Sequence, residues 1–394
     1  MRSKLLTFAL VLAAAAVLLI DGTAGPRTLQ FTVRTPEGGI VIEPGPGGAA
    51  VRAVTDTGEP LAALADPGRA ALPMRVVNVL IPPGERVSGV RAIARRESRI
   101  ARAFRPILAQ QPSPGPDAPA PRLLPEPTAG VAPAGATDAF PAELARLAGS
   151  GTWHGYTIAS VAVFPLRLES GDLLAATEIE LSLELEAVAA GAEPARALRM
   201  MPAGADEIAA RLGALVINPA DAGAYPSLPA APRPGAFSPS ALPTLEGSPV
   251  DYVIVTTENL AAAFDSLAEW KTAAGVPTVV RTVEWISANY RQGTDLAETI
   301  RFFLRDAYTH WGTQHVLLAG DTPEIPPRYL YSAYYYGGTL IPADIYFAGL
   351  DGSFNADGDD RFGEMPADAP DLWVELNVAR LPVSTPAAAN VVIS

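Results

Sequence analysis

The sequence predicts a multidomain chain in which a β-sandwich-like N-terminal region precedes an α/β domain with a parallel sheet. Three observations predict this organisation. Short runs with β-strand character, one of them strictly alternating, fill residues 26 to about 190. From Val250 onward, apolar strand-like runs alternate with segments of helical periodicity. Two proline-rich stretches, 106–133 with nine prolines and 226–243 with six, separate these parts because proline disfavours both helix interiors and central strands.

The first 25 residues have the pattern of a secretory signal peptide. Arg2 and Lys4 precede the apolar run "LLTFALVLAAAAVLLI", and the small residues "GTAG" follow it. A membrane anchor is the alternative, although sixteen residues are fewer than the ~20 that a bilayer span needs. We therefore expect bacterial-type export to the medium or the cell surface, with no membrane span after signal cleavage.

The N-terminal half alternates strand-like runs with Gly and Pro. Ile179, Leu181, Leu183 and Leu185 are separated by polar residues, which is the period-2 pattern of a strand with one solvated face. The expected organisation is a β-rich region over 26–105, a Pro-rich linker or insertion over 106–140, a β-rich continuation over 141–193, and a Pro/Ala-rich linker over 194–248.

Residues 249–394 follow a different pattern. "DYVIVTT", "PTVVRTV" and "HVLLAG" are continuous apolar runs, as in strands that are covered on both faces. A helical spacing from Leu260 to Lys271 separates the first two, and Gly275 is placed to end that helix. Thr294 is placed to cap a second helix, whose apolar face extends to Trp311. Strand, helix, strand, helix, strand predicts a parallel sheet.

Composition restricts the chemistry and the partners of the chain. The 394 residues include no cysteine, so disulfides cannot stabilise it and packing or bound metal must. The formal charge is −13, and residues 249–394 hold 19 Asp and Glu against 8 Lys and Arg, a net of −11. Such a surface is a poor partner for nucleic acid.

The stretch "DGSFNADGDDRFGE", residues 351–364, places five acidic side chains in fourteen positions. Closely spaced oxygen ligands on a glycine-bearing turn are what Ca²⁺ requires. The helix-flanked calcium signature does not fit, because Asp360 stands where it requires glycine and Pro366 where it requires glutamate. A looser calcium loop and a solvated acidic turn both remain open. Asp321, directly after "HVLLAG", is either a site residue at a strand end or a turn residue.

Several blocks of residues 250–394 resemble, in the same order, the start of the catalytic domain of the gingipain family of secreted cysteine peptidases. These blocks are "YVIVTTENLAAAFDSLAEWKTAAGVPTVV", "HVLLAGDTPEIPP", "ADIYFAGLDGSFNADGDDRFGE" and "LWVELNVARLPVST". The earlier "RVVNVLIPPGERVSGV" and "WHGYTIASVAVFPLRL" are similar to the β-rich propeptide that precedes this domain in the family.

The resemblance implies an exported precursor of a cysteine endopeptidase with a caspase-like fold. Its substrates would be proteins or peptides, and its own propeptide would be a partner that covers the substrate cleft. The implied mechanism uses a His/Cys dyad and an acyl-enzyme. We expect both dyad residues beyond Ser394, so that the chain is a fragment of the precursor, contains no catalytic residue and is inactive by itself. For His154, His310 and His315 we expect structural or surface roles, with a serine-based triad using His310 or His315 as the alternative.

The resemblance also favours structural calcium. A non-catalytic alternative is a secreted, calcium-stabilised surface or adhesion protein that keeps a peptidase-like fold. The expected ligands are Asp357, Asp359 and Glu364 first, Asp344, Asp351 and Asn355 second, with Asp321 and Glu375 in a separate site near the strand ends.

Overall fold

The computed structural model describes residues 27–45, 47–64, 68–109, 139–189, 205–226, 237–332, 339–365 and 367–393. The expected signal peptide and most of the expected insertion over 106–140 lie outside the described residues. Among the helices that the model describes, none combines the length and the apolar character that crossing a bilayer requires.

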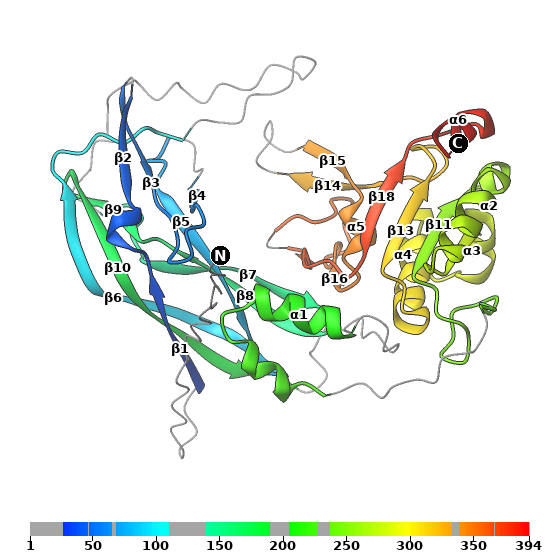
Figure 1. Cartoon of the computed structure of the whole chain (residues 1–394), viewed down its shortest axis with the longest axis horizontal. Helices are drawn as coiled ribbons and strands as arrows, with labels where there is room; N and C mark the ends of the chain where they lie inside the picture. Colours follow the sequence, from blue (N-terminus) through cyan, green and yellow to red (C-terminus); the bar gives the residue numbers. More distant parts are fainter. Residues whose placement is uncertain are drawn as a thin grey trace, which may run out of the picture.

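The N-terminal unit contains two four-stranded antiparallel sheets, on the left in Figure 1. One sheet has the order β1-β10-β6 with β9 beside β10, the other has the order β4-β5-β8-β7, and β2 pairs with β3. The strands are β1 (Arg27–Arg34), β2 (Val41–Gly45), β3 (Gly48–Arg52), β4 (Ala62–Ala63), β5 (Pro73–Leu80), β6 (Glu85–Ala101), β7 (Ala145–Trp153), β8 (Tyr156–Val163), β9 (Leu166–Glu169) and β10 (Asp172–Ala187).

One hydrophobic core joins these two sheets. Leu181 and Leu183 of β10 pack in the same cluster as Val79 of β5 and Val161 of β8. The alternation in β10 directs every second side chain into this core, as expected for a sandwich with solvated outer faces. Because β6 and β10 pair with each other, the segments on either side of 106–140 form a single unit.

A helix, α1 (Ala205–Leu215), lies in the stretch expected to be a linker. Its Leu212 packs with Leu80, Trp153 and Ile158 of the N-terminal unit. Trp373 of the C-terminal unit joins the same cluster. The apolar positions of α1 thus form part of the contact between the two units.

The C-terminal unit contains a four-stranded parallel sheet with the order β12-β11-β13-β18, on the right in Figure 1. This confirms the parallel sheet that the sequence predicts. The elements are β11 (Tyr252–Thr256), α2 (Glu258–Ala273), β12 (Thr278–Thr282), α3 (Val283–Asn289), α4 (Leu296–Asp306), the π-helical turn η3 (Ala307–Trp311), β13 (His315–Ala319), β14 (Arg328–Ser332), β15 (Thr339–Ala343), α5 (Ile345–Ala348), β16 (Gly352–Ser353), β17 (Ala369–Pro370), β18 (Asn377–Leu381) and α6 (Pro386–Ile393). Short 3-10 turns at Glu37–Gly39 and Pro219–Ala224 complete the described elements.

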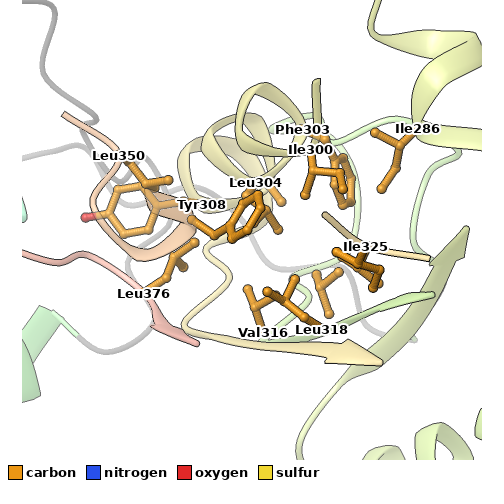
Figure 2. Packing of buried hydrophobic residues seen from close by; sticks show 14 of the residues in the cluster. Ile286, Ile300, Phe303, Leu304, Tyr308, Val316, Leu318, Ile325, Leu350 and Leu376 are labelled. Carbon is orange, nitrogen blue, oxygen red and sulfur yellow. The ribbon is translucent and has the colours of Figure 1, made fainter. Parts of the chain in front are cut away.

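Helices cover both faces of this sheet. Val316 and Leu318 of β13 pack with Ile300 and Leu304 of α4 in one cluster, which Figure 2 shows between the helix and the strand. Ile254 of β11 turns to the opposite face, where it packs against α2 and α6. The continuous apolar strand runs follow from this double coverage.

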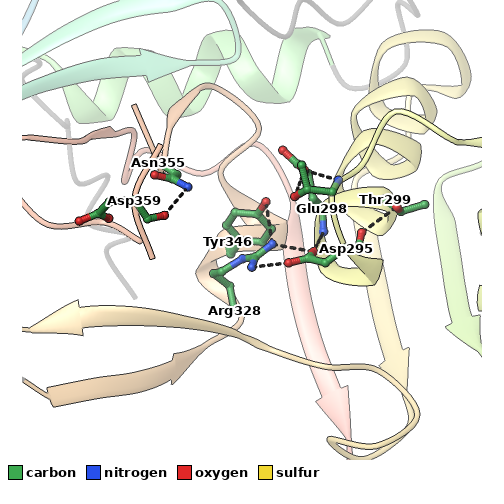
Figure 3. A network of polar contacts seen from close by, with 8 residues as sticks. Asp295, Glu298, Thr299, Arg328, Tyr346, Asn355 and Asp359 are labelled. Atoms are coloured by element: carbon green, nitrogen blue, oxygen red, sulfur yellow. Dashed lines mark hydrogen bonds and ion pairs between the residues drawn. The ribbon is translucent and has the colours of Figure 1, made fainter. Parts of the chain in front are cut away.

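The start of α4 differs from the sequence expectation. Asp295, not Thr294, is the N-cap, and its carboxylate accepts a hydrogen bond from the Glu298 amide at 2.8 Å. The same carboxylate receives both Nη atoms of the buried Arg328, at 2.7 and 2.8 Å, as Figure 3 shows. Asp295 is preferred over Thr294 as the N-cap because its carboxylate caps the helix and also pairs with an arginine 33 residues later in the chain.

Candidate metal centre

The carboxyl ends of the parallel strands hold Asp321, Asp344 and Arg380. Asp321 follows β13 and accepts a hydrogen bond from the Thr322 amide at 2.8 Å, which is a local turn contact. Arg380 of β18 makes two 2.7 Å bonds to Asp344 and also donates to the carbonyls of Gly320 and Ile325. Asp344 is therefore committed to Arg380 and does not join the acidic loop, where the sequence placed it.

Glu375 lies at the opposite edge of the sheet from Asp321. It precedes β18, whereas Asp321 follows β13, and these two strands run parallel with His315 beside Asn377. The expectation that Asp321 and Glu375 share a site is wrong. The reason is that one residue follows its strand and the other precedes the neighbouring parallel strand, so the length of the strands separates them.

Instead, Glu375 lies in a buried carboxylate centre with Asp351 and Asp371. The three residues are 4%, 2% and 6% exposed. Glu375 Oε2 accepts from the Leu350 amide at 2.8 Å, and Oε1 has no hydrogen-bond partner among the described residues. Asp371 accepts from the amides of Trp373 at 2.9 Å and of Thr152, in the N-terminal unit, at 2.5 Å.

Arg301 of α4 is a half-buried cation beside this centre. Its guanidinium lies over the rings of Tyr346 and Phe354, each at 5.1 Å. It donates to the carbonyls of Gly349 and Asp351 at 2.8 to 3.1 Å. Its hydrogen bonds therefore position the loop that carries Asp351, and its single charge faces three carboxyl groups.

The electrostatics of the centre are those of excess negative charge in a dry environment. Burial, followed by the charge of Asp351, raises the pKa of the Glu375 carboxyl to about 9. Burial likewise raises the pKa of Asp371 to about 6, against the opposing effect of its two backbone hydrogen bonds. The dry environment therefore favours the protonated forms of these two carboxyl groups.

The exposed acidic loop brings together a second group. Asp357, Asp359 and Glu364 each offer one carboxylate oxygen, and these oxygens lie within 4.8 Å of one another. Glu364 also contacts Arg361 at 3.6 Å, and Asp359 Oδ1 accepts from the Arg361 amide at 2.7 Å. Asn355 donates its amide to the Asp359 carbonyl at 3.0 Å, on the left of Figure 3.

Asp368 holds this loop in place from within. Its carboxylate is 3% exposed and accepts from the backbone amides of Ala356, Gly363 and Glu364, the last two at 2.6 and 3.2 Å. The shape of the loop is thus set by an anion that binds backbone N–H groups, and no metal is needed for that.

Each of the three histidines makes a contact that gives it a structural role. His310 contacts Asp306 at 2.6 Å on the last turn of the helix. His315 stacks on Tyr252, and burial lowers its pKa. His154 hydrogen-bonds Tyr308 at 2.7 Å, across the two units.

Sequence reasoning missed Asp371 and Asp368, which the structure places at the two acidic groups. Asp371 stands immediately before the block "LWVELNVARLPVST" and four residues before Glu375. Two acidic residues four positions apart, next to an expected strand, were the sequence signal that could have identified Asp371. Nothing local distinguishes a buried aspartate such as Asp368 from its exposed neighbours.

Comparisons with known proteins agree with the resemblance stated from the sequence. Residues 246–394 match the model of peptidase family C25. No curated protein sequence matches the chain.

Three solved structures from Porphyromonas gingivalis are similar at low identity. The complex of RgpB pro- and mature domains has 15% identity and a TM-score of 0.29, covering 50% of this chain and 94% of that chain. A structure of gingipain K that concerns its zymogenic latency has 14% identity and a TM-score of 0.28, covering 43% of this chain and 98% of that chain. Dimeric latent PorU has 13% identity and a TM-score of 0.27, covering 94% of this chain and 38% of that chain. At these TM-scores the three similarities carry no argument.

Proposed function

Because residues 246–394 match the model of peptidase family C25, the gingipain-type peptidases, we propose that the chain is part of an exported cysteine endopeptidase precursor. The family match is the observation that carries this proposal. The parallel sheet with helices on both faces supports it, since an α/β scaffold of this kind presents loops at the strand ends where chemistry is placed. In this proposal the fold of residues 249–394 is caspase-like, and the destination is the medium or the cell surface.

The proposed reaction is peptide-bond hydrolysis through a His/Cys dyad. A thiolate attacks the scissile carbonyl, an acyl-enzyme forms, and water releases the product. The 394 residues contain no cysteine, so we assign the dyad to sequence outside them. This chain supplies the signal peptide, the β-rich N-terminal unit acting as propeptide, and the first part of the peptidase scaffold.

Calcium is the proposed structural ion, and two groups of carboxylates are candidates for holding it. The loop group, Asp357, Asp359 and Glu364, has converging oxygens but is solvated and partly paired with Arg361. Among the described residues, the loop group alone brings three carboxylate oxygens within 4.8 Å of one another, so the buried group of Asp351, Asp371 and Glu375 fits a single cation less well. Hard oxygen donors with irregular geometry suit Ca²⁺ better than Mg²⁺. We therefore propose the loop group as the calcium site.

A second candidate function is a calcium-stabilised surface or adhesion protein without catalysis. The converging carboxylates of the acidic loop are the observation that favours it. In this case the peptidase-like fold would serve only as a stable scaffold.

The test is expression of this chain and, separately, of a longer reading frame that contains it. We expect no peptide hydrolysis by the 394-residue chain and hydrolysis by the longer product that an alkylating reagent abolishes. A longer product that folds but hydrolyses no peptide would refute the peptidase proposal and leave the adhesion protein.

A further inference from the structure

Residues 205–226 belong to the N-terminal unit, although the sequence predicts a linker there. Asn218 makes two 2.8 Å hydrogen bonds with the backbone of Leu80, donating to its carbonyl and accepting from its amide. The Tyr225 hydroxyl accepts from the Thr157 amide at 2.9 Å. These contacts hold both ends of the stretch after α1 against β5 and β8, so this stretch is part of the β-rich unit.

Residues 237–250, by contrast, belong to the C-terminal unit. The Val250 amide donates to the Trp311 carbonyl at 3.1 Å, and the Thr313 hydroxyl donates to the Val250 carbonyl at 2.8 Å. Val250 is also buried in the core of that unit. The chain therefore passes from one unit to the other within 227–236. A cut in that interval would leave two polypeptides, each of which keeps its own hydrophobic core.

The two units meet at the two-residue turn between β7 and β8, His154 and Gly155. Their φ values are +49° and +84°, the positive values that this kind of tight hairpin turn requires. Asn-Gly, Asp-Gly and Gly-Gly are the usual pairs at such a turn, so the turn itself does not explain the histidine. Its contact with the C-terminal unit does, because the ring hydrogen-bonds the Tyr308 hydroxyl at 2.7 Å and stacks on the Tyr308 ring at 5.8 Å.

Gly151 of β7 allows the strand that leads into this turn to approach the C-terminal unit closely. A Cβ atom built at Gly151 would lie 2.6 Å from Trp373 Cδ1 and would also collide with the Asp371 carboxylate, which accepts from the Thr152 amide. At Gly149, two residues earlier, a Cβ atom would meet no atom within 4 Å. The two glycines are thus a matched pair, because a larger side chain obstructs the contact only at Gly151.

The contact has the composition of a binding hot spot. Trp153 and Tyr308, from different units, are 9% and 0% exposed, and Trp373 packs in the cluster that contains Trp153. Buried Trp and Tyr side chains grouped in this way contribute most of the binding energy in protein interfaces. Tyr308 is in η3 and Trp373 precedes β18, on the amino-terminal side of the parallel strands. The contact therefore lies at the edge of the sheet opposite to the strand ends where α/β proteins bind ligands.

We propose that this contact is an anchor that keeps the N-terminal unit bound to the C-terminal unit as a separate polypeptide after the chain is cut within 227–236. The C-terminal unit thus presents a docking surface, formed by Tyr308, Asp371 and Trp373, for the β7–β8 hairpin of its partner. This binding requires no catalytic activity, so it is independent of the proposed peptidase function. We expect a Kd below about 1 μM, as buried aromatic anchors at an interface permit.

The experiment uses the full 394-residue chain with the recognition sequence of a site-specific protease placed within 227–236. The folded chain is cut and then analysed by sedimentation velocity over a dilution series. The two polypeptides should sediment as one particle at about 10 μM and separate only below about 1 μM. Hydrogen exchange of the Val161 amide, in the core of the N-terminal unit, reports whether that unit remains folded.

Two substitutions in the N-terminal unit test the anchor, and a third is the control. Gly151→Val should raise the Kd at least about 30-fold, whereas Gly149→Val should leave it unchanged. His154→Asn should raise the Kd about 5-fold, because asparagine suits the turn but lacks the ring that contacts Tyr308. The Val161 amide should stay protected in all three variants.

Tyr308→Phe tests the same contact from the C-terminal unit. It removes the hydroxyl and keeps the buried ring, so it should also raise the Kd about 5-fold. Combined with His154→Asn, it should raise the Kd by less than the product of the two single effects, because both substitutions remove the same hydrogen bond.

Two results would overturn the proposal. If the polypeptides separate at about 10 μM while the Val161 amide stays protected, the contact does not hold the units together once the chain is cut. If Gly151→Val and His154→Asn bind as tightly as the unmutated chain, other contacts hold the units. If Gly151→Val unfolds the N-terminal unit, the combination of His154→Asn with Tyr308→Phe decides, since fully independent effects would reject the anchor and coupled effects would support it.

Discussion

The amide of Thr152 donates a 2.5 Å hydrogen bond to the carboxylate of Asp371, 219 residues later in the chain. This bond joins a strand end of the N-terminal β unit to the acidic centre of the α/β unit. It makes Asp371 a member of both the interface and the centre, so changes to either should affect the other.

Calcium should raise the melting temperature of the chain, and the acidic loop should account for most of the increase. At 100 times its Kd, an ion that binds only the folded state adds ~2.7 kcal/mol. Asp357→Ala should reduce the difference between calcium and chelator more than Asp360→Ala does, because Asp357 belongs to the group of converging carboxylates and Asp360 does not. Melting curves in calcium, magnesium and chelator measure this. Equal melting temperatures in calcium and chelator would contradict it.

Stability without calcium should fall as the pH rises. The folded pKa of Glu375, about 9, and that of Asp371, about 6, are above the ordinary values of 4.5 and 3.8. The folded state thus holds protons that the unfolded state releases. This stabilisation is fully present at a pH below the ordinary pKa values, and it is lost as the pH rises through the pKa values of the folded state. Between pH 6 and 8, Glu375 should contribute a slope of ~1.4 kcal/mol per pH unit.

Glu375→Gln should remove that slope, because glutamine is neutral and still accepts from the Leu350 amide. Urea unfolding from pH 5 to 9 in chelator measures the effect. The same slope in the variant and the unmutated chain would show that Glu375 does not carry the proton.

Asp295→Ala should destabilise the C-terminal unit more than Thr294→Ala does. Asp295 is the N-cap of α4 and pairs with both Nη atoms of the buried Arg328. Loss of a cap costs about 1 kcal/mol, and leaving a buried guanidinium unpaired adds to it. Asp295→Asn, which keeps the cap and loses the charge, should lie between the two. Chemical denaturation compares the three variants, and equal effects of Asp295→Ala and Thr294→Ala would contradict the assignment.

Asp368→Ala should loosen the acidic loop even without calcium. Its carboxylate accepts from three loop amides, and each would lose a charge-assisted partner. Limited proteolysis in chelator should cut the variant within 356–364 faster than the unmutated chain. The control is Asp360→Ala, an exposed neighbour in the same loop. Equal cleavage of both variants would show that the loop is held by other contacts.

The sequence by itself determined the elements whose signals are local. The alternation from Ile179 to Leu185 predicts a half-buried strand, and β10 is one, because neighbouring side chains of a strand point to opposite faces. Gly275 does end α2 with φ of +90°, a conformation that glycine adopts without strain. The continuous apolar runs after Val250 form the parallel sheet, because strands that are covered on both faces are apolar at successive positions. The match to the family model, residues 246–394, covers this sheet.

Tertiary structure alone decided the acidic centres. Asp351 and Asp357 belong to one acidic stretch, yet Asp351 is buried with Glu375 and Asp371 while Asp357 is exposed. Asp321 and Glu375 both stand next to strands, but the parallel pairing of β13 and β18 places them at opposite edges. Burial and charge compensation depend on contacts between residues that are far apart in sequence, as with Thr152 and Asp371. Local periodicity contains no information about such contacts, so the fold must form before these carboxylates become a site.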